Sequence, residues 1–329
     1  MDSSVDSQFV ATLVACIILN VGCLQENWYG YHIRDPSEWG KMYARCADNH
    51  DQSPIKIEEA ETVYDRVLSA PVLHGGWEYV PTSVLMLENN GHTMELVFKD
   101  NHIRMHGAHL THEFYLKQCH FHWGEDIEKP GSEHWLNGKQ YDAEMHCVFI
   151  NVDFVPGTEE EIYDREAWAV FAVFIKFDSE KPNEYIDYLL SHTDAIREAG
   201  HNYSFNQEKK KADIRHLLPD NLSEYYRYQG SLTSPPCYEF VVWTIFNNPI
   251  HISRDQAEKL FELHNFVKER NVGYMNITGN FRPPQPLAGR TVYRSFRDID
   301  DKLNTAYDQL SNGLVILFTL FAALFCARD

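Results

Sequence analysis

The sequence is poor in positive charge. Its 329 residues include 29 lysines and arginines but 48 aspartates and glutamates, which gives a formal net charge of −19 at pH 7. Proteins that bind nucleic acid neutralise phosphates with Lys and Arg, so this balance argues against a nucleic-acid partner. The one basic run, residues 209–211, is most simply a solvated surface segment.

The sequence also lacks internal repeats, low-complexity tracts and linkers that would divide it. A length of 329 residues allows one large domain or two ordinary ones. Hydrophobic residues make up 44% of the chain and aromatic residues 13%, which is ample for a sizeable core. We therefore expect one main globular domain.

Neither terminal apolar run is long enough to span a membrane comfortably. Residues 9–22 fit the hydrophobic region of a signal peptide, with Val21 and Cys23 near the cleavage point, although the preceding segment carries Asp2 and Asp6 and no basic residue. Residues 314–326 would form a helix roughly 20 Å long, against a bilayer core of about 30 Å. A short apolar tail behind a polar spacer is typical of a GPI-anchor signal, and a short spanning helix is the alternative. We predict a signal peptide over 1–23, a folded domain over 24–303 and an anchor signal over 304–329.

Sequons and cysteines agree with a secretory route. Three Asn-x-Ser/Thr sequons mark candidate N-glycosylation sites at Asn202, Asn221 and Asn276. Removal of the terminal segments would take away three of the seven cysteines. An even number then remains, as expected of a disulfide framework: Cys46, Cys119, Cys147 and Cys237.

Between its ends the chain reads mostly as short strands broken by turns. The expected strands cover residues 84–88, 93–99, 102–106, 113–123, 141–151, 168–177 and 238–246. Helices are expected over 160–167, 181–196 and 253–269, and Ser253 is the N-cap of the last one. This pattern predicts a mainly β (α+β) single domain around a mostly antiparallel sheet.

Two short runs, residues 118–123 and 144–148, alternate polar and apolar side chains with the period of a strand. Gln118, His120 and His122 share one face of the first run, and Glu144, His146 and Val148 share one face of the second. If the two strands pair in antiparallel fashion, the three imidazoles converge at one point.

Three histidines and an open fourth position make up the ligand set of a catalytic zinc site. Gln118 and Glu144 each precede a ligand by two residues on the same face, where they would accept its second ring N–H. A lone His-x-His is weak by itself, because the chain has 17 histidines. A structural zinc site is the alternative, but it would normally recruit a fourth protein ligand, and no obvious candidate faces this point.

At this point the residues resemble the alpha-class carbonic anhydrases. The resemblance runs in order from about Trp28 to Arg290 without a large gap, and it is closest to the extracellular, GPI-linked members. The matching stretches are residues 28–31, Trp39, 52–55, 89–92, 122–124, 131–134, 144–146, 228–236 and 280–286. The resemblance implies a large twisted sheet of about ten strands with short helices on its surface.

It also implies an activity: the reversible hydration of CO2 to bicarbonate and a proton by zinc-bound hydroxide, at the outer face of the cell membrane. His120, His122 and His146 would hold the Zn2+, and Asn280 would join Gln118 and Glu144 in supporting them. Sulfonamides and anions would inhibit at the zinc. A catalytically silent binding or adhesion module on the same fold is the alternative function.

The remaining site residues follow from the same resemblance. Thr233 would orient the hydroxide, with Glu133 accepting the Thr233 hydroxyl proton. His92 would carry protons out of the site, and Tyr31 and Asn89 would hold the water chain. The substrate pocket would be lined by Thr233 and Ser234 and by five apolar residues that could equally be plain core: Val148, Val170, Leu232, Val241 and Trp243.

Family members outside the cell have a disulfide at the positions of Cys46 and Cys237, which would brace the loop of Thr233. Cys119 and Cys147 point away from the histidine face, and the register that pairs His120 with His146 places them opposite each other. A second, cross-strand disulfide or two buried free thiols are both open there.

Overall fold

The computed structural model describes residues 29–31, 35–48, 50–75, 80–81, 85–154, 164–205, 211–212, 214–269 and 273–297. The predicted signal peptide and anchor signal lie outside these residues, as does the first half of the helix expected over 160–167. Residues 164–167 form a turn that leads into the strand beginning at Trp168, so the helix prediction is wrong in the part that is described. Within the described residues, no helix is both long and apolar enough to cross a membrane.

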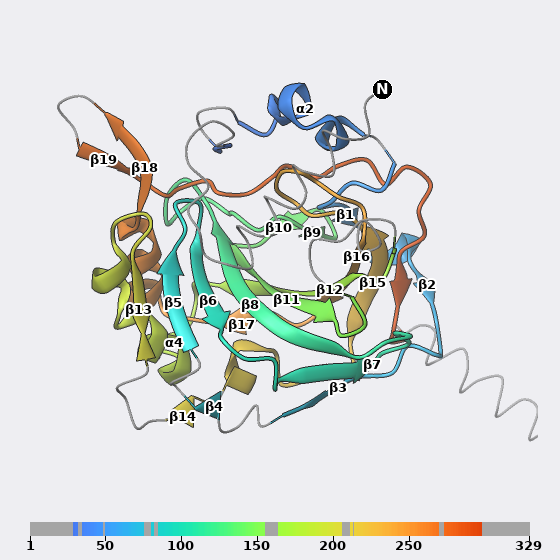
Figure 1. The fold of residues 1–329 in the computed structure, drawn as a ribbon. Helices are drawn as coiled ribbons and strands as arrows, with labels where there is room; N and C mark the ends of the chain where they lie inside the picture. Colours follow the sequence, from blue (N-terminus) through green and yellow to red (C-terminus); the bar gives the residue numbers. More distant parts are fainter. Residues whose placement is uncertain are drawn as a thin grey trace, which may run out of the picture.

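One sheet of thirteen strands forms the body of the molecule, and ten of them follow a single path in the order β13-β5-β6-β8-β11-β12-β16-β15-β20-β2 (Figure 1). The path strands are β2 (Val63–Tyr64), β5 (Leu85–Asn89), β6 (Met94–Phe98), β8 (Phe114–Trp123), β11 (Ala143–Asn151), β12 (Trp168–Lys176), β13 (Asn202–Ser204), β15 (Tyr225–Gly230), β16 (Val241–Phe246) and β20 (Tyr293–Arg294). The remaining three are β3 (Pro71–His74), β7 (Arg104–Gly107) and β17 (Ile250–His251). The predicted mainly β fold around a large sheet is confirmed.

Most neighbouring strands of this sheet are antiparallel, but β12 runs parallel to β16 and to β17, and β2 runs parallel to β20. The central strands β11 and β12 are buried along almost their whole length, which explains their nearly continuous hydrophobic sequence. A smaller three-stranded sheet consists of β1 (Lys56–Ile57), β9 (Trp135–Leu136) and β10 (Lys139–Gln140). Two-stranded sheets are formed by β4 (Val80–Pro81) with β14 (Lys211–Ala212) and by β18 (His264–Glu269) with β19 (Gly273–Asn276).

Side-chain alternation along the central strands divides the core between the two faces of the sheet. Phe149 and Phe171 belong to the larger apolar cluster, while Val148 and Val170 belong to the other. The histidine face of β8 and β11 is the face of Val148, so the candidate site rests on the smaller cluster.

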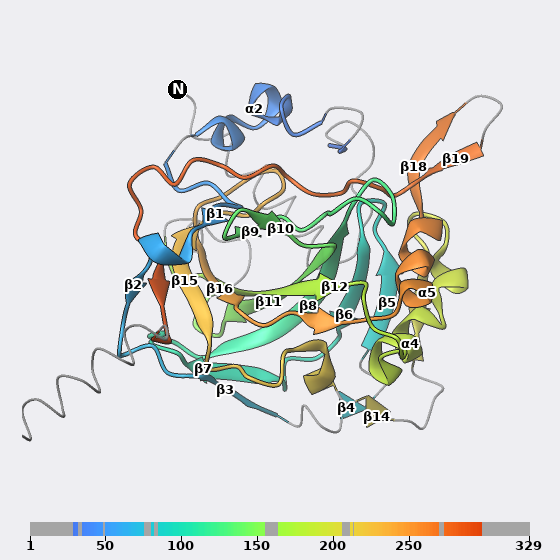
Figure 2. The same ribbon diagram turned by 180° about the vertical axis from the view of Figure 1, so that it is seen from behind.

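The helices are short: α2 (Trp39–Met42), α4 (Glu184–Leu190) and α5 (Arg254–Glu258), with several 3-10 turns. The helix expected over 181–196 is α4, capped by Asn183, followed by a 3-10 turn at Thr193–Ile196. Figure 2 shows α4 and α5 side by side near β5, where Asn183 and Gln256 exchange hydrogen bonds.

The prediction of a helix over 253–269 is wrong in its second half. Ser253 does cap α5, in a capping box with Gln256, and a 3-10 turn follows at Lys259–Glu262. The backbone of Leu263 is then extended, and His264–Glu269 pairs with β19 in a hairpin that projects from the body (Figures 1 and 2). Pairing with a partner strand outweighs the helix propensity of this segment.

Candidate functional site

Strands β8 and β11 bring the three histidines together. They pair in antiparallel fashion with His120 opposite His146 and Glu144 opposite His122. One ring nitrogen from each histidine lies within 4.8 Å of the others, and His122 Nε2 is 3.2 Å from His146 Nδ1. The convergence expected from the alternating pattern is therefore present.

The outward-facing nitrogens of two of these rings are held by carbonyl or carboxylate oxygens. His120 Nδ1 lies 2.9 Å from Gln118 Oε1, and His146 Nε2 lies 2.6 Å from Glu144 Oε1. An oxygen partner fixes the ring orientation and leaves the other nitrogen's lone pair for a metal. His120 thus presents Nε2 to the centre, whereas His146 presents Nδ1.

The third ring is held by the backbone of Asn280, whose carbonyl oxygen is 2.7 Å from His122 Nδ1. The Asn280 side chain secures this position, because its Oδ1 accepts from Trp123 N and its Nδ2 donates to the carbonyls of Phe121 and His92. Asn280 thereby joins the last segment of the domain to β8 and to the loop of His92.

Burial makes His120 and His146 suitable as neutral ligands. Burial, with smaller contributions from His122 and His146, holds the pKa of His120 well below its usual value, and burial also lowers the pKa of His146. A metal displaces protons from its ligands, so imidazoles that are already neutral bind it more readily. Three ring nitrogens, each on an imidazole whose other nitrogen is held by an oxygen, fit the donor set of a catalytic zinc site.

A fully buried chain of polar groups extends from Glu144. Its two carboxylate oxygens lie 2.8 Å from His134 N and 2.7 Å from His134 Nδ1. His134 Nε2 is 2.7 Å from the Tyr228 hydroxyl, which donates to Ser53 Oγ at 2.8 Å. Although burial alone would raise it, the interactions with His134 and His146 hold the pKa of Glu144 far below its usual range. Sequence reasoning assigned no role to His134, Tyr228 or Ser53, although all three fall in stretches that matched the family.

Glu133 lies beside the histidines and is completely buried. Its Oε1 accepts a hydrogen bond from Arg282 N at 2.7 Å and is 3.6 Å from His122 Nδ1. Its Oε2 has no hydrogen-bond partner among the described residues. Thr233 is also buried, but within the same residues no hydrogen bond joins its hydroxyl to Glu133, so the Thr233–Glu133 pairing stays a prediction.

His92 is stacked on Tyr29, with ring centroids 4.2 Å apart and planes at 5°. Burial lowers the pKa of His92 to about 4 in this position, away from the near-neutral value expected of a proton carrier. Tyr29 also hydrogen-bonds Ser234, so it connects His92 with the loop of Thr233. The sequence analysis assigned no role to Tyr29. Its assignment of Tyr31, which packs against Tyr29 and Trp39, to the water chain stays a prediction.

The Asn89 amide is fully engaged with backbone. It donates to the carbonyls of Arg197 and His264, and its Oδ1 accepts from Gly91 N. This arrangement favours a structural role for Asn89 over the predicted role in a water chain. The next residue, Asn90, instead donates to Glu95 Oε2 at 2.9 Å.

Glu95, on β6, is a further titratable group on the histidine side of the sheet. It lies opposite His120 of β8. Burial, with a smaller contribution from the charge of Glu88, raises the pKa of Glu95 to about 7.

The residues expected to form an apolar wall are gathered on one face. Val148 lies opposite Val170, and Val170 lies opposite Trp243, whose ring centroid is 4.7 Å from that of His146. Val241 is buried in the same cluster, and the half-buried Leu232 packs against it. This geometry places apolar surface beside the histidines.

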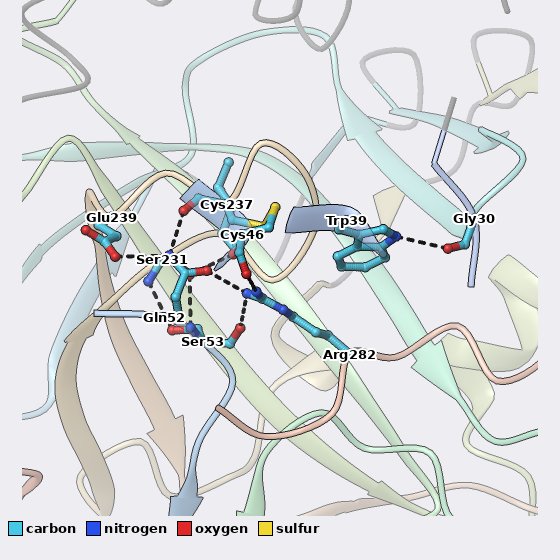
Figure 3. The surroundings of a disulfide bond; sticks show 10 residues. Gly30, Trp39, Cys46, Gln52, Ser53, Ser231, Cys237, Glu239 and Arg282 are labelled. Carbon is cyan, nitrogen blue, oxygen red and sulfur yellow. Dashed lines mark hydrogen bonds between the residues drawn. A yellow bond between two sulfur atoms is a disulfide. The ribbon is translucent and has the colours of Figure 1, made fainter. Parts of the chain in front are cut away.

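The disulfide between Cys46 and Cys237 joins the 3-10 turn Ala44–Ala47 to the loop that contains Thr233 (Figure 3). Arg282 donates to Gln52 Oε1, Ser53 O and Cys46 O, while Gln52 donates to Cys237 O. Cys119 and Cys147, which face each other across β8 and β11, form a second disulfide. Both pairings proposed from the sequence are therefore present, and the alternative of two free thiols is not.

Comparison with known proteins agrees with this geometry. The model of the eukaryotic-type carbonic anhydrase family matches residues 34–296. The chain is 33% identical to carbonic anhydrase 12 of Homo sapiens over 291 residues, covering 88% of this chain and 77% of that protein. It is 33% identical to carbonic anhydrase 3 of Rattus norvegicus over 283 residues, covering 83% of this chain and all of that protein. It is 35% identical to carbonic anhydrase 7 of Mus musculus over 277 residues, covering 82% and 97% of the two chains. With this extent of similarity, the chain belongs to the eukaryotic-type carbonic anhydrase family of enzymes.

Proposed function

We propose that this enzyme hydrates CO2 reversibly to bicarbonate and a proton at a zinc ion held by His120, His122 and His146. The observation that carries the proposal is the convergence of three ring nitrogens within 4.8 Å, with the opposite nitrogen of each ring held by an oxygen. Zinc, when bound, would supply a Lewis acid that makes hydroxide available at neutral pH, an effect for which carbonic anhydrase is itself the standard example.

The proposed work of Thr233 is to orient the reacting oxygen. Its hydroxyl would donate to Glu133 Oε2, the buried oxygen that has no other partner among the described residues. The Thr233 oxygen would then act only as an acceptor toward the reacting water or hydroxide. Its backbone N–H would polarise a substrate oxygen.

The apolar wall supports an apolar substrate. CO2 carries no charge and gains little from polar contacts, so a surface of aliphatic and indole side chains beside the metal suits it. We assign this surface to the residues predicted for the pocket: Val148, Val170, Leu232, Val241 and Trp243. Ser234 would border it next to Thr233.

We assign proton removal to His92, on the condition that its ring can leave the stacked position on Tyr29. While His92 is stacked on Tyr29 its pKa of about 4 makes it a weak acceptor at neutral pH. It would therefore accept the proton after turning away from Tyr29 into solvent, where an imidazole has a pKa near 6.5. Tyr29 and Asn90 join Tyr31 as our candidates for ordering water along this route.

We propose a secretory route and a GPI anchor at the outer face of the membrane. Two disulfides suit an oxidising compartment, and the sequon residues Asn202, Asn221 and Asn276 are all exposed. Release from intact cells by a phosphatidylinositol-specific phospholipase would support the anchor. Retention after that treatment would favour the short spanning helix instead.

The first test is stopped-flow CO2 hydration against pH on the purified enzyme, with zinc quantified. We expect one catalytic zinc per chain and turnover that rises near neutral pH and is blocked by a sulfonamide. His120→Ala should lose zinc and activity together, whereas Thr233→Ala should keep zinc and lose about 100-fold in rate. Zinc without hydration in the wild type would overturn the proposal and favour a silent binding module.

A further inference from the structure

A second group of metal-ligating side chains lies where β3, β7 and the start of β8 meet. His74 ends β3, His106 is on β7, and Glu113 directly precedes β8. Figure 1 shows β3 and β7 running together along the lower edge of the sheet. Glu113 and His120 are seven positions apart along extended chain, or roughly 20 Å, so this cluster is separate from the three site histidines.

Strand register places the two imidazoles on one face. In the antiparallel pair of β3 and β7, His74 lies opposite Arg104 and Val72 lies opposite His106. His74 and His106 are therefore diagonal neighbours, with ring centroids 5.2 Å apart. His74 Nε2 is 3.0 Å from Glu113 Oε1. One ligand atom from each of His74, His106 and Glu113 lies within 4.8 Å of the other two.

Arg104 decides which carboxylate oxygen remains available. Its Nη1 donates to Glu113 Oε2 at 2.7 Å, and this hydrogen bond lowers the pKa of Glu113. The positive charge of Arg104 opposes cation binding, but the same contact keeps the carboxylate ionised and turns Oε1 toward the imidazoles. Ligating carboxylates in metal sites are held in this way by an outer hydrogen bond.

We propose that His74, His106 and Glu113 form a second metal site, which binds a divalent late transition-metal ion such as copper or zinc. Two imidazoles and one carboxylate suit these ions, whereas calcium and magnesium prefer oxygen ligands. The His74 and Glu113 side chains keep 42% and 36% of their surface exposed, so the site is open to solvent and to exchange. Water completes the coordination.

A bound ion would replace the His74–Glu113 hydrogen bond and join three segments of the sheet edge. Because the imidazole nitrogens must be unprotonated to bind, affinity falls as the pH is lowered. Because the folded chain alone brings the three ligands together, added metal raises the melting temperature.

The test uses the full enzyme with its catalytic zinc already loaded and zinc or copper ions as the probe. We expect metal analysis after equilibrium dialysis to find one equivalent beyond the catalytic zinc. His106→Ala should weaken this second equivalent at least tenfold, and Glu113→Gln should weaken it as well. CO2 hydration should be unchanged in both variants. His109→Asn is the matched control, because His109 is an exposed histidine of the turn after β7 and asparagine tolerates its positive φ of 58°.

Electron paramagnetic resonance of bound Cu2+ gives a second readout. The wild type and His109→Asn should show nitrogen hyperfine structure from two imidazoles, and His106→Ala should lose one of them. Absence of a second equivalent, or equal binding by all variants, would overturn the proposal. If the three site histidines failed to hold zinc, the total metal content would fall by one equivalent, but the remaining equivalent would still be weakened by His106→Ala. Failure of the proposed function and failure of the second site are therefore distinguishable.

Discussion

At the scale of single residues, the three site histidines differ in the nitrogen that they present. His120 and His122 present Nε2, because Gln118 and the Asn280 carbonyl hold their Nδ1 atoms. His146 presents Nδ1, because Glu144 holds Nε2. The tautomer of each ring is therefore set by a neighbour outside the centre.

We expect Glu144→Gln to weaken zinc binding by about 10- to 100-fold. The substitution removes the charge that holds His146 and sets an amide N–H against one of the two donors of His134. Competition with a chelator measures the change. Glu125→Gln, at an exposed glutamate just beyond β8, is the control. Wild-type affinity in Glu144→Gln would remove Glu144 from the supporting role.

The half-buried position of His92, stacked on Tyr29, predicts a contribution to the pH dependence of stability. Its pKa is about 4 when folded and near 6.5 when unfolded, so the unfolded chain binds a proton that the folded chain does not. The free energy of unfolding therefore has its full value, as far as His92 is concerned, above pH 6.5, and it decreases as the pH falls toward 4. His92→Gln should therefore show a shallower fall in the free energy of unfolding over this range, measured by urea denaturation. Profiles identical to the wild type would contradict burial of this ring.

At the scale of elements, short helices depend on their ends. Ser253 Oγ accepts from Gln256 N, and Gln256 Oε1 accepts from Ser253 N. The same Gln256 side chain also bonds the backbone of Asn183 at the start of α4. The capping box of α5 thus connects two helices.

We expect Ser253→Ala to lower the free energy of unfolding by about 1 kcal/mol, because it leaves a helix N–H without its acceptor. Ser253→Thr keeps the hydroxyl and should cost much less. Urea denaturation of the two variants gives the comparison. Equal losses would show that the hydroxyl is not responsible.

The period-2 pattern was sufficient to predict the elements that carry the site. It placed His120, His122 and His146 on one face, and the register then put Cys119 opposite Cys147. Local pattern could not show that Tyr29 stacks on His92 or that the Asn89 amide bonds the backbone, because these contacts depend on tertiary partners. The same limit explains β18, which became a strand only through its pairing with β19.

At the scale of the whole molecule, distant segments are joined behind the loop of Thr233. The Cys46–Cys237 disulfide links residues 191 positions apart, and Arg282 bonds the same region from near the end of the domain. Three parts of the chain thus fix the position of one loop.

We expect the double variant Cys46→Ala, Cys237→Ala to lose about 2–5 kcal/mol of unfolding free energy, because the unfolded chain is no longer constrained by a long closed loop. Guanidinium denaturation of the oxidised proteins measures this loss. Reduced activity at temperatures where the variant remains folded would show that the disulfide also positions Thr233. Unchanged stability would contradict a bracing role.

The pairing of β2 with β20 has a consequence for biosynthesis. Val63 meets Tyr293, which the ribosome adds roughly 230 residues later. At translation rates of about 5 to 20 residues per second, β20 is synthesised roughly 10 to 50 s after β2. The sheet therefore cannot close while the chain is emerging, and its first edge strand must be kept from pairing with other nascent chains until synthesis of the domain is complete.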